Sequence, residues 1–216
     1  FYLRMQERFY DWVEYYREPA YAKMLPDPLP ADVQPPTLVL NLDETLIYSS
    51  WDYQHGWRIA KRPFVDYFLA YISQFFEVVI ITSQPQMNAE PILHKLDPVG
   101  YVPHRFYRDA TRYFEGKHVK DLSHLNRDLS QVIIMDSNPD AYGLQPDNAI
   151  AVPPWQGKAG DTYLRDIVPF LLTLSETRPA DVRPILKAYY GKDIPKTFAE
   201  MERQLLESYQ KEWKEE

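Results

Sequence analysis

Three short apolar runs in this chain are typical of buried β-strands, and segments that favour helices separate them. The runs begin at Thr37, Val78 and Val132, and a shorter fourth run begins at Ala149. The helices are expected over about residues 63–75, 86–96 and 161–174. Strands that alternate with helices in this way predict a parallel sheet with helices on both faces.

Polar residues stand at the carboxyl ends of the three main strands. Because parallel strands end at the same edge of a sheet, and ligands of such sheets bind beyond that edge, we expect these side chains to converge there. They are Asn41 and Asp43 after the first strand, Thr82 after the second, Asp136 and Ser137 after the third, and Lys120 between the last two.

The segment Asn41–Ser50, with the sequence Asn-Leu-Asp-Glu-Thr-Leu-Ile-Tyr-Ser-Ser, resembles the signature of the haloacid-dehalogenase-fold phosphatases of the polymerase C-terminal-domain type. That family has Asp-x-Asp-x-Thr at the end of its first strand. The resemblance extends over roughly residues 37–175 and implies an α/β, three-layer, haloacid-dehalogenase-like fold with a central parallel sheet. Its further matches are Lys61-Arg62-Pro63, Thr82, His118–Ser123, Asn126–Ser130 and Pro146–Ile150.

In such phosphatases the first aspartate attacks phosphorus and the second acts as general acid and base. The resemblance puts Asn41 at the nucleophile position and Asp43 at the acid position. It also implies phosphate contacts for Thr82 and Lys120, and Mg²⁺ binding for Asp136 and its neighbour Ser137. An amide is a poor nucleophile and a weak ligand for Mg²⁺. We therefore expect a degenerate phosphatase with no catalytic residue, no bound metal and no cofactor.

A narrower resemblance concerns segments that are unlike the active phosphatases. They are similar to the receptor subunits of the presequence translocase of the mitochondrial inner membrane, and they include Trp51, Gln54–Arg58, Leu96-Asp97-Pro98 and Arg108–Tyr113. This likeness implies a domain that faces the intermembrane space and an anchor N-terminal to it. It also implies two partners, mitochondrial presequences and the channel-forming subunit of the translocase.

The charge balance of the chain suits cationic partners. Its net charge is −7 and its pI is about 5.3, which argues against a nucleic-acid surface because such a surface needs clustered Lys and Arg. Presequences are Arg-rich amphipathic helices that are poor in acidic residues. A chain that is both acidic and rich in aromatic residues has the two ingredients that a receptor for such helices requires.

The segment Tyr113–Val119 is expected to form an inserted β-hairpin with Gly116 at a positive-φ position. Tyr113, Phe114 and Glu115 are the predicted partner-binding residues, because two aromatic rings beside a turn are costly to expose without a purpose. The alternative is that both rings fold back onto the sheet. An additional strand is expected at Trp57–Lys61.

Four segments are expected along the chain. They are an N-terminal helix within residues 1–24, a proline-rich linker at 25–36, the phosphatase-like domain at 37–176 and a C-terminal helical extension at 177–216. Apolar stripes on the two terminal helices can pack on the core, on a membrane or on another chain. No cysteine is present, which excludes disulfides and thiolate metal sites.

Two other functions compete with the receptor hypothesis. One is a residual phosphoserine/threonine phosphatase, which Asn41 argues against. The other is a phosphopeptide-binding module that retains Thr82 and Lys120 for phosphate contact but performs no chemistry.

Overall fold

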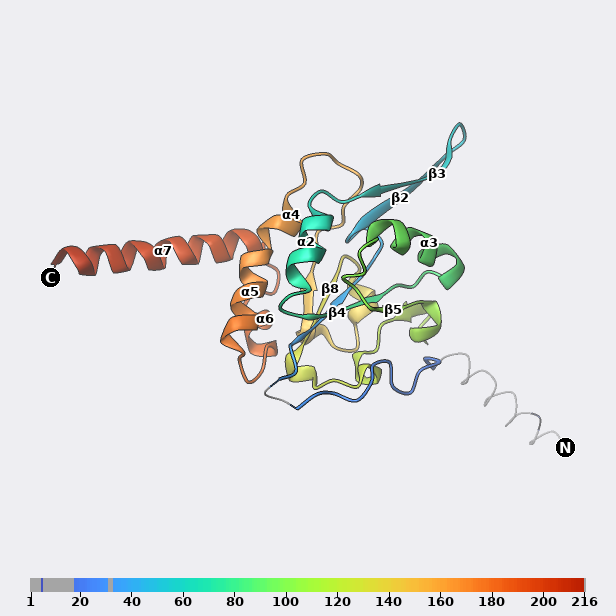
Figure 1. Cartoon of the computed structure of the whole chain (residues 1–216), viewed down its shortest axis with the longest axis horizontal. Helices are drawn as coiled ribbons and strands as arrows, with labels where there is room; N and C mark the ends of the chain where they lie inside the picture. Colours follow the sequence, from blue (N-terminus) through green and yellow to red (C-terminus); the bar gives the residue numbers. More distant parts are fainter. Residues whose placement is uncertain (1–4, 6–17, 31–32, 216) are drawn as a thin grey trace.

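The computed structural model describes residue 5 and residues 18–30 and 33–215. Its centre is a parallel sheet of five strands in the order β5-β4-β1-β8-β9 (Figure 1). The four expected strands are confirmed, and β5 is an addition that the sequence did not indicate. The strands are β1 (Thr37–Leu40), β4 (Glu77–Ile81), β5 (His104–Phe106), β8 (Val132–Asp136) and β9 (Ala149–Ala151).

Both faces of the sheet are buried, as apolar parallel strands require. Successive side chains of β1 alternate between two core clusters, so that Leu38 and Leu40 pack on one face and Val39 on the other. The first face is covered by the α-helices. These are α2 (Val65–Ile72), α3 (Gln86–Leu96), α4 (Tyr163–Asp166), α5 (Val168–Thr177), α6 (Arg183–Ala188) and α7 (Ile194–Glu215).

The second face is covered differently from our expectation. Instead of long α-helices, short 3₁₀ turns pack there together with Met24 and Leu25 from the N-terminal segment. The turn η2 (Leu122–Leu125) contributes two leucines, and Ala110 and Tyr142 come from two further turns. The stretch between β5 and β8 is divided by turns into short elements, so it has no room for a long amphipathic helix. The remaining 3₁₀ turns are η1 (Arg108–Ala110), η3 (Leu129–Gln131), η4 (Pro139–Tyr142) and η5 (Pro146–Asn148).

Two helix predictions need correction. The helix expected over 161–174 is broken at Ile167 into α4 and α5, and Pro169 lies in the first turn of α5. Proline has no N–H and is suited to a first turn rather than a helix interior, which explains the break. The helix expected from Pro63 starts at Val65, because Phe64 adopts a left-handed conformation (φ 66°) before it.

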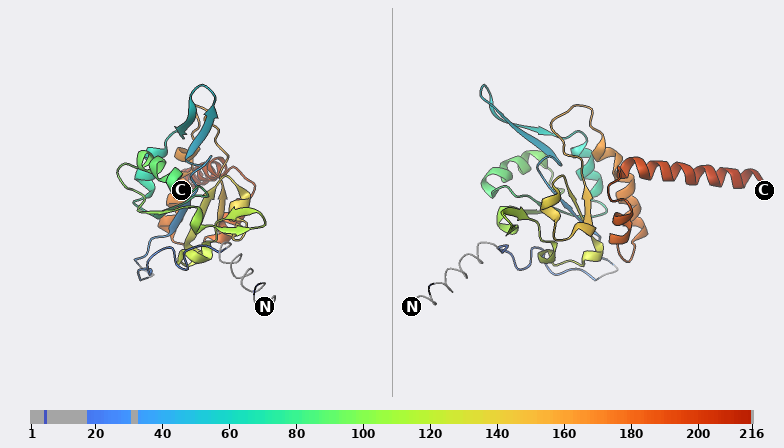
Figure 2. Two further views of the ribbon diagram at one scale, coloured as in Figure 1. Left: turned by 90° about the vertical axis from the view of Figure 1, so that its right-hand side faces the viewer. Right: turned by 180° about the vertical axis from the view of Figure 1, so that it is seen from behind.

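Two antiparallel hairpins extend from the sheet. The longer one consists of β2 (Ile47–Asp52) and β3 (Gly56–Lys61), and it projects away from the body of the molecule (Figures 1 and 2). The expected strand at Trp57–Lys61 is its second half, whereas β2 was not expected. In the turn, the carboxylate of Asp52 accepts hydrogen bonds from the backbone N–H groups of Gln54 and His55.

The shorter hairpin consists of β6 (Arg112–Phe114) and β7 (Lys117–Val119) and confirms the expected insertion. Both turn residues, Glu115 (φ 48°) and Gly116 (φ 82°), have positive φ. Two positive-φ residues are characteristic of the tight turn whose twist matches the flanking strands. The chain leaves β7 directly into Lys120, which links this hairpin to the candidate site.

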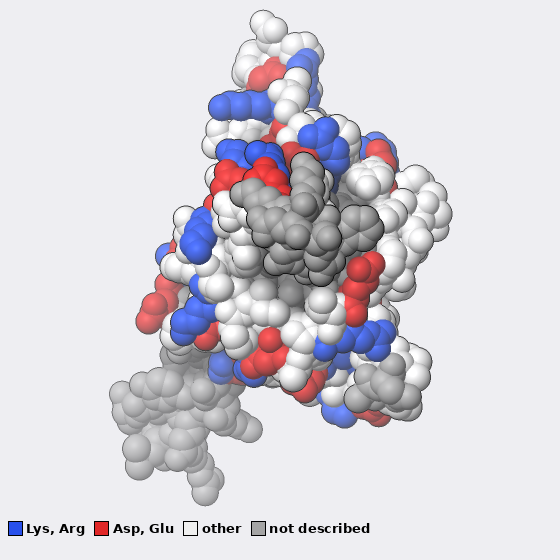
Figure 3. All heavy atoms as spheres, turned by 90° about the vertical axis from the view of Figure 1, so that its left-hand side faces the viewer, with Lys and Arg blue, Asp and Glu red and all other residues white. Residues whose placement is uncertain are grey.

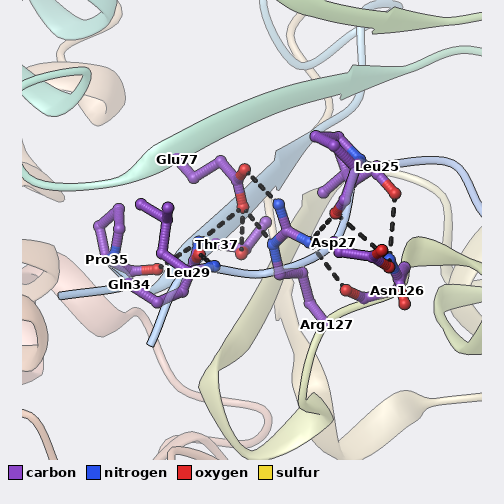
Figure 4. A network of polar contacts seen from close by, with 10 residues as sticks. Leu25, Asp27, Leu29, Gln34, Pro35, Thr37, Glu77, Asn126 and Arg127 are labelled. Atoms are coloured by element: carbon purple, nitrogen blue, oxygen red, sulfur yellow. Dashed lines mark hydrogen bonds and ion pairs between the residues drawn. The ribbon is translucent and has the colours of Figure 1, made fainter. Parts of the chain in front are cut away.

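The proline-rich segment packs on the domain and is more than a spacer. The side-chain amide of Asn126 donates to the carbonyls of Leu25 and Pro26 at 3.2 Å each. Arg127 donates to the carbonyl of Pro26 and forms two 2.7 Å hydrogen bonds with the carboxylate of Glu77 at the start of β4 (Figure 4). Prolines lack donors but keep their carbonyls, and these carbonyls fix the segment to the core.

The C-terminal helix α7 begins on the core and then extends away from it (Figures 1 and 2). Phe198 packs edge-on against Phe170 of α5, with ring centroids 5.5 Å apart. Further along, Met201, Leu205 and Leu206 are exposed. The N-terminal helix expected within residues 1–24 falls mostly outside the described residues, and the described residues 18–24 are not helical. In the part of the chain that the structure describes, no helix is long and apolar enough to cross a membrane.

Candidate functional site: a saturated polar cluster at the strand ends

The polar residues expected to converge do lie together at the carboxyl edge of the sheet. Asn41 and Asp43 follow β1, Thr82 follows β4, and Asp136 is the last residue of β8. The backbone N–H of Asn41 donates to the carbonyl of Met135 at 3.0 Å, which continues the β1–β8 ladder to the site. Hydrogen bonds join Thr45, Ser137 and the backbone of Asp43 in the adjacent loops.

The side-chain amide of Asn41 has partners at both of its ends. Its Oδ1 accepts a hydrogen bond from Nζ of Lys120 at 2.7 Å. Its Nδ2 donates to Oδ1 of Asp136 and to the carbonyl oxygen of Asp43, each at 2.9 Å. A lysine can only donate and a carboxylate can only accept, so this network fixes which way the amide points. A neutral amide held in this way cannot serve as a nucleophile.

Lys120 and Asp136 form a buried ion pair beside this amide. Nζ of Lys120 lies 2.5 Å from Oδ2 of Asp136, and both side chains are almost completely inaccessible to solvent. Burial lowers the pKa of Lys120 below its ordinary value, and the attraction of Asp136 opposes that change. Oδ1 of Asp136 also accepts the backbone N–H of Asn138 at 2.9 Å. Both oxygens of this carboxylate are therefore engaged by donors of the chain itself.

Gln84 is a member of the cluster that sequence reasoning missed. Its Nε2 donates to Oδ1 of Asp43 at 2.6 Å, and its backbone N–H donates to the hydroxyl of Thr82 at 3.2 Å. Burial raises the pKa of Asp43 above its ordinary value, and the hydrogen bond from Gln84 opposes this rise. The available signal was its position two residues after Thr82, at the same strand end.

Arg62 supports the loop that follows β1. Its buried guanidinium forms two hydrogen bonds with the carboxylate of Asp161, at 2.8 and 2.9 Å, and donates to the carbonyl of Thr45 at 3.2 Å. Paired contacts between a guanidinium and a carboxylate are among the stronger polar interactions in proteins. Arg62 thus ties this loop to the segment that precedes α4 and holds Thr45 beside Asn41.

The residues of the cluster do not fit the Mg²⁺ ion that the fold family uses. The oxygens that face the centre, from Asp136 and from the backbone of Asp43, already accept hydrogen bonds from Nδ2 of Asn41. Lys120 adds a positive charge within 2.7 Å of Asn41. Among the described residues, no group of three or more His, Cys, Asp or Glu side chains is placed to hold a metal ion.

The predicted partner-binding residues make none of the hydrogen bonds described for this cluster: Tyr113 and Phe114 lie in β6, and Glu115 lies in the turn that follows. Tyr113 is 43% exposed and Phe114 is 47% exposed, so neither ring is folded back onto the sheet. The ring of Tyr113 lies 5.3 Å from the ring of His118 on the opposite strand. A role for Tyr113, Phe114 and Glu115 in partner binding remains a prediction.

The family of the chain follows from its sequence and agrees with this geometry. The model of the NLI interacting factor-like phosphatase family matches residues 36–183, and the chain belongs to that family. A solved structure described as Fcp1, an essential RNA polymerase II CTD phosphatase, shares the fold. It aligns with a TM-score of 0.50 and 21% identity, covering 74% of this chain and 56% of that one.

Within this family the chain resembles a particular group of proteins. It is 47% identical over 215 residues to the mitochondrial import inner membrane translocase subunit tim50 of Aspergillus fumigatus, covering 100% of this chain and 43% of that protein. It is 49% identical over 199 residues to the subunit of the same name from Neurospora crassa, covering 92% of this chain and 37% of the relative. The chain thus spans less than half the length of these relatives.

Proposed function

We propose that this chain is a non-catalytic receptor and docking domain in mitochondrial protein import. Its partners would be cationic amphipathic presequences and the channel-forming subunit of the inner-membrane translocase, and it would act in the intermembrane space. The observation that carries the proposal is the state of Asn41, whose amide is hydrogen-bonded to Lys120, Asp136 and Asp43 where a phosphatase needs a free carboxylate. The similarity to the fungal import subunits supports the cellular role.

The same contacts argue against phosphopeptide binding at this site. A phosphate would need the ammonium group of Lys120, but that group is buried and already paired with Asp136. Breaking a buried ion pair leaves an uncompensated charge, at a cost of about 3–5 kcal/mol. A phosphorylated ligand would have to offset this cost before it gained any affinity.

A groove beside the longer hairpin is the surface that we assign to the channel-forming subunit. It has a volume of about 750 Å³ and lies between β2–β3 and α3. Apolar side chains supply much of its lining, among them Trp57, Ile59 and Ile92. The charged side chains in the lining are Lys61 and Lys95, and Lys61 is also paired with Asp66. Such a groove favours an apolar or acidic segment over a cationic presequence.

The presequence would then use a different surface, and the β6–β7 turn remains our candidate for it. Tyr113 and Phe114 offer apolar area, and Glu115 adds a negative charge beside them. The face that carries α5 and α6 is a less suitable alternative. Acidic and basic side chains are interspersed over it rather than gathered into one acidic patch (Figure 3).

A fluorescence anisotropy titration tests the receptor function. The ligand is a labelled amphipathic presequence peptide, and the control is a scrambled peptide of equal charge with a broken apolar face. We expect binding in the micromolar range for the amphipathic peptide alone. That binding should partly persist at physiological salt, because salt screens exposed charges more than buried apolar contacts. Equal, salt-sensitive binding of both peptides would count against a selective presequence site.

A parallel assay separates the receptor from a residual phosphatase. We expect no Mg²⁺-dependent hydrolysis of a phosphoserine peptide. Turnover that requires Mg²⁺ and disappears in an Asp43→Ala variant would overturn the non-catalytic assignment. The mass of the protein should be checked beforehand, because slow deamidation of Asn41 would create an aspartate at the nucleophile position and imitate such activity.

A further inference from the structure

The loop between β9 and α4, residues 152–162, lies beside the base of the β2–β3 hairpin (Figures 1 and 2). Its Trp155 is buried. The backbone N–H of Trp155 donates to the carbonyl of Glu44 at 2.8 Å, and its ring nitrogen donates to the carbonyl of Lys158 at 2.9 Å. The loop is therefore tied to the turn that precedes β2, and the indole ring holds the loop closed.

Tyr48 of β2 packs against this loop. Its ring meets the ring of Trp155 edge to face, with centroids 6.4 Å apart and an angle of 78° between the planes. Gly157 approaches the same ring so closely that a Cβ there would lie 3.1 Å from Cδ1 of Tyr48. Glycine suits this position because it has no Cβ and tolerates the φ of 80°. The loop thus contacts Tyr48 at two points.

The neighbours of Tyr48 along β2 face the groove that lies between the hairpin and α3. Successive side chains of a strand point to opposite faces, and Ile47 and Ser49 line the groove. Tyr48 points to the other face, toward the loop. On the far side of the groove, α3 supplies Asn88 and Ile92. The hairpin is therefore one wall of the groove, and its angle sets how wide the groove is.

The contact between the hairpin and α3 on the groove side is of a weaker kind. Nζ of Lys61 reaches the carbonyl of Leu96 at 3.4 Å and the carboxylate of Asp66 at 2.9 Å. Exposed pairs of this type contribute little, and a long flexible side chain does not fix the angle of the strand that carries it. A ring packed on a buried indole constrains that angle much more.

We propose that Trp155, Tyr48 and Gly157 form a brace that sets the angle of the β2–β3 hairpin and thereby the width of the groove. The lining of the groove includes none of these three residues, so they are positioning residues for partner docking and do not contact the partner in the groove. The docking part of this inference rests on the proposed function of the groove. The position of the hairpin can be measured without any partner, so the two parts are tested separately.

Gly157→Ala and Gly160→Ala are a matched pair of variants. Both glycines lie in the same loop and have positive φ, 80° and 88°, so alanine causes comparable backbone strain at either position. A Cβ at Gly160 would meet no atom within 4 Å, whereas a Cβ at Gly157 would press on Tyr48. Because Trp155 holds the loop in place, we expect the ring of Tyr48, and β2 with it, to move only in Gly157→Ala.

A distance measurement between spin labels tests the brace. The chain has no cysteine, so labels can be attached to introduced cysteines, Gln54→Cys in the hairpin turn and Met87→Cys on α3, both at exposed positions. Double electron–electron resonance then gives the distribution of distances between the two labels. We expect a shifted or broadened distribution for Gly157→Ala and the native distribution for Gly160→Ala. A native distribution in Gly157→Ala would overturn the proposal.

Tyr48→Ala provides a second variant, which removes the ring without introducing a clash. It should broaden the distance distribution. In that background the added methyl of Gly157→Ala has no ring to press on, so it should change the distribution no further. An equal effect of Gly157→Ala with and without the ring would show local strain alone and contradict the brace. If Gly157→Ala does not fold, a native distribution in Tyr48→Ala would overturn the proposal.

Titration calorimetry with the soluble part of the channel-forming subunit tests the docking role. We expect Gly157→Ala to weaken binding by about fivefold and Gly160→Ala to change it by less than about twofold. A displaced hairpin with unchanged affinity would support the brace and contradict the groove as the docking surface for that subunit. Weaker binding with an undisplaced hairpin would overturn the brace.

Discussion

The two hairpins of this domain are both antiparallel strand pairs, but they differ in length and in how they contact the rest of the domain. The β2–β3 hairpin has six-residue strands and carries Trp51, Tyr53 and Trp57 at 59%, 93% and 74% exposure. The β6–β7 hairpin has three-residue strands and is anchored near its turn by an ion pair from Lys117 to Asp140 at 2.6 Å. One hairpin projects from the body, whereas the other is fastened to it.

The difference indicates distinct roles. Aromatic side chains that are grouped on a projecting element and left in water usually mark a surface that a partner covers. The shorter hairpin leads directly into Lys120, so its position also affects the polar cluster at the strand ends. We therefore regard β2–β3 as the main docking element and β6–β7 as a smaller contact surface that is coupled to the core.

The largest expected effect concerns the two tryptophans of β2–β3. Trp51 and Trp57 face each other directly in the hairpin register. A buried interface tryptophan often contributes at least about 2 kcal/mol, which is about 30-fold in affinity. The Trp51→Ala and Trp57→Ala pair should therefore weaken binding to the channel-forming subunit by about 30-fold if one ring dominates, and by about 1,000-fold if the two contributions add. The folded domain should keep its Tm within a few degrees, because both rings are exposed. Titration calorimetry with the soluble part of that subunit measures the loss.

The matched control is the Tyr113→Ala and Phe114→Ala pair. It should reduce binding of the presequence peptide while changing affinity for the channel-forming subunit by less than about threefold, or less than about 0.7 kcal/mol. If both pairs weaken binding of both partners equally, the two hairpins do not have separate partners.

The shorter hairpin was predictable from sequence and the longer one only in part. Gly116 after Glu115 marks a tight turn between two extended segments. The segment Ile47–Asp52 mixes apolar and polar residues without such a turn signal, and the feature that orders its loop is the carboxylate of Asp52. These hydrogen bonds of the Asp52 carboxylate can be recognised only when the backbone conformation of the loop is known.

The strand-end cluster was also predictable only in part. Asn41, Asp43 and Asp136 were placed correctly because strand period and strand ends follow from local sequence. Gln84 was missed because its function depends on Asp43, a residue 41 positions away. The docking of the proline-rich segment depends on Arg127, which lies 101 positions from Pro26. Local patterns identify elements and their ends, whereas contacts between distant segments appear only in the folded chain.

The turn glycines provide a smaller test of how firmly each hairpin is attached. Gly56 and Gly116 both have positive φ, and a Cβ at either position would meet no atom within 4 Å. Alanine at such a φ costs about 1 kcal/mol through backbone strain alone. Gly116→Ala should lower the free energy of unfolding by about that amount. Gly56→Ala should lower it less, because the projecting tip can open without unfolding the domain.

Urea unfolding monitored by tryptophan fluorescence and by circular dichroism measures both changes. The slope of the transition should be the same for the native chain and both variants. Equal losses of stability would mean that β2–β3 unfolds together with the core. A larger loss for Gly56→Ala would mean that β2–β3 contributes more to the stability of the domain than β6–β7, contrary to our expectation.

The smallest expected effect is a pH dependence confined to β6–β7. The hydroxyl of Thr111 donates to the carbonyl of Arg108 at 2.6 Å, so it accepts the hydrogen bond from Nδ1 of His118 at 2.9 Å. Burial, and then repulsion from Arg108, lowers the pKa of His118 in the folded chain. A histidine with a lowered pKa releases its proton on folding. It therefore stabilises the fold at pH above its ordinary value of about 6.5, and that contribution is lost as pH falls through the folded pKa.

Amide hydrogen exchange of β6–β7, corrected for the intrinsic pH dependence of exchange, tests this prediction. Protection should decrease between neutral pH and about pH 5, a range that crosses the titration of a histidine with a lowered pKa. A His118→Gln variant retains a side-chain donor for Thr111 but does not titrate, so its protection should be constant over the same range. Because His118 is partly exposed, solvent screening keeps the effect small. If the native hairpin and the variant lose protection in parallel, a group other than His118 controls the pH dependence. His118 would then not be the contact that distinguishes β6–β7 from β2–β3.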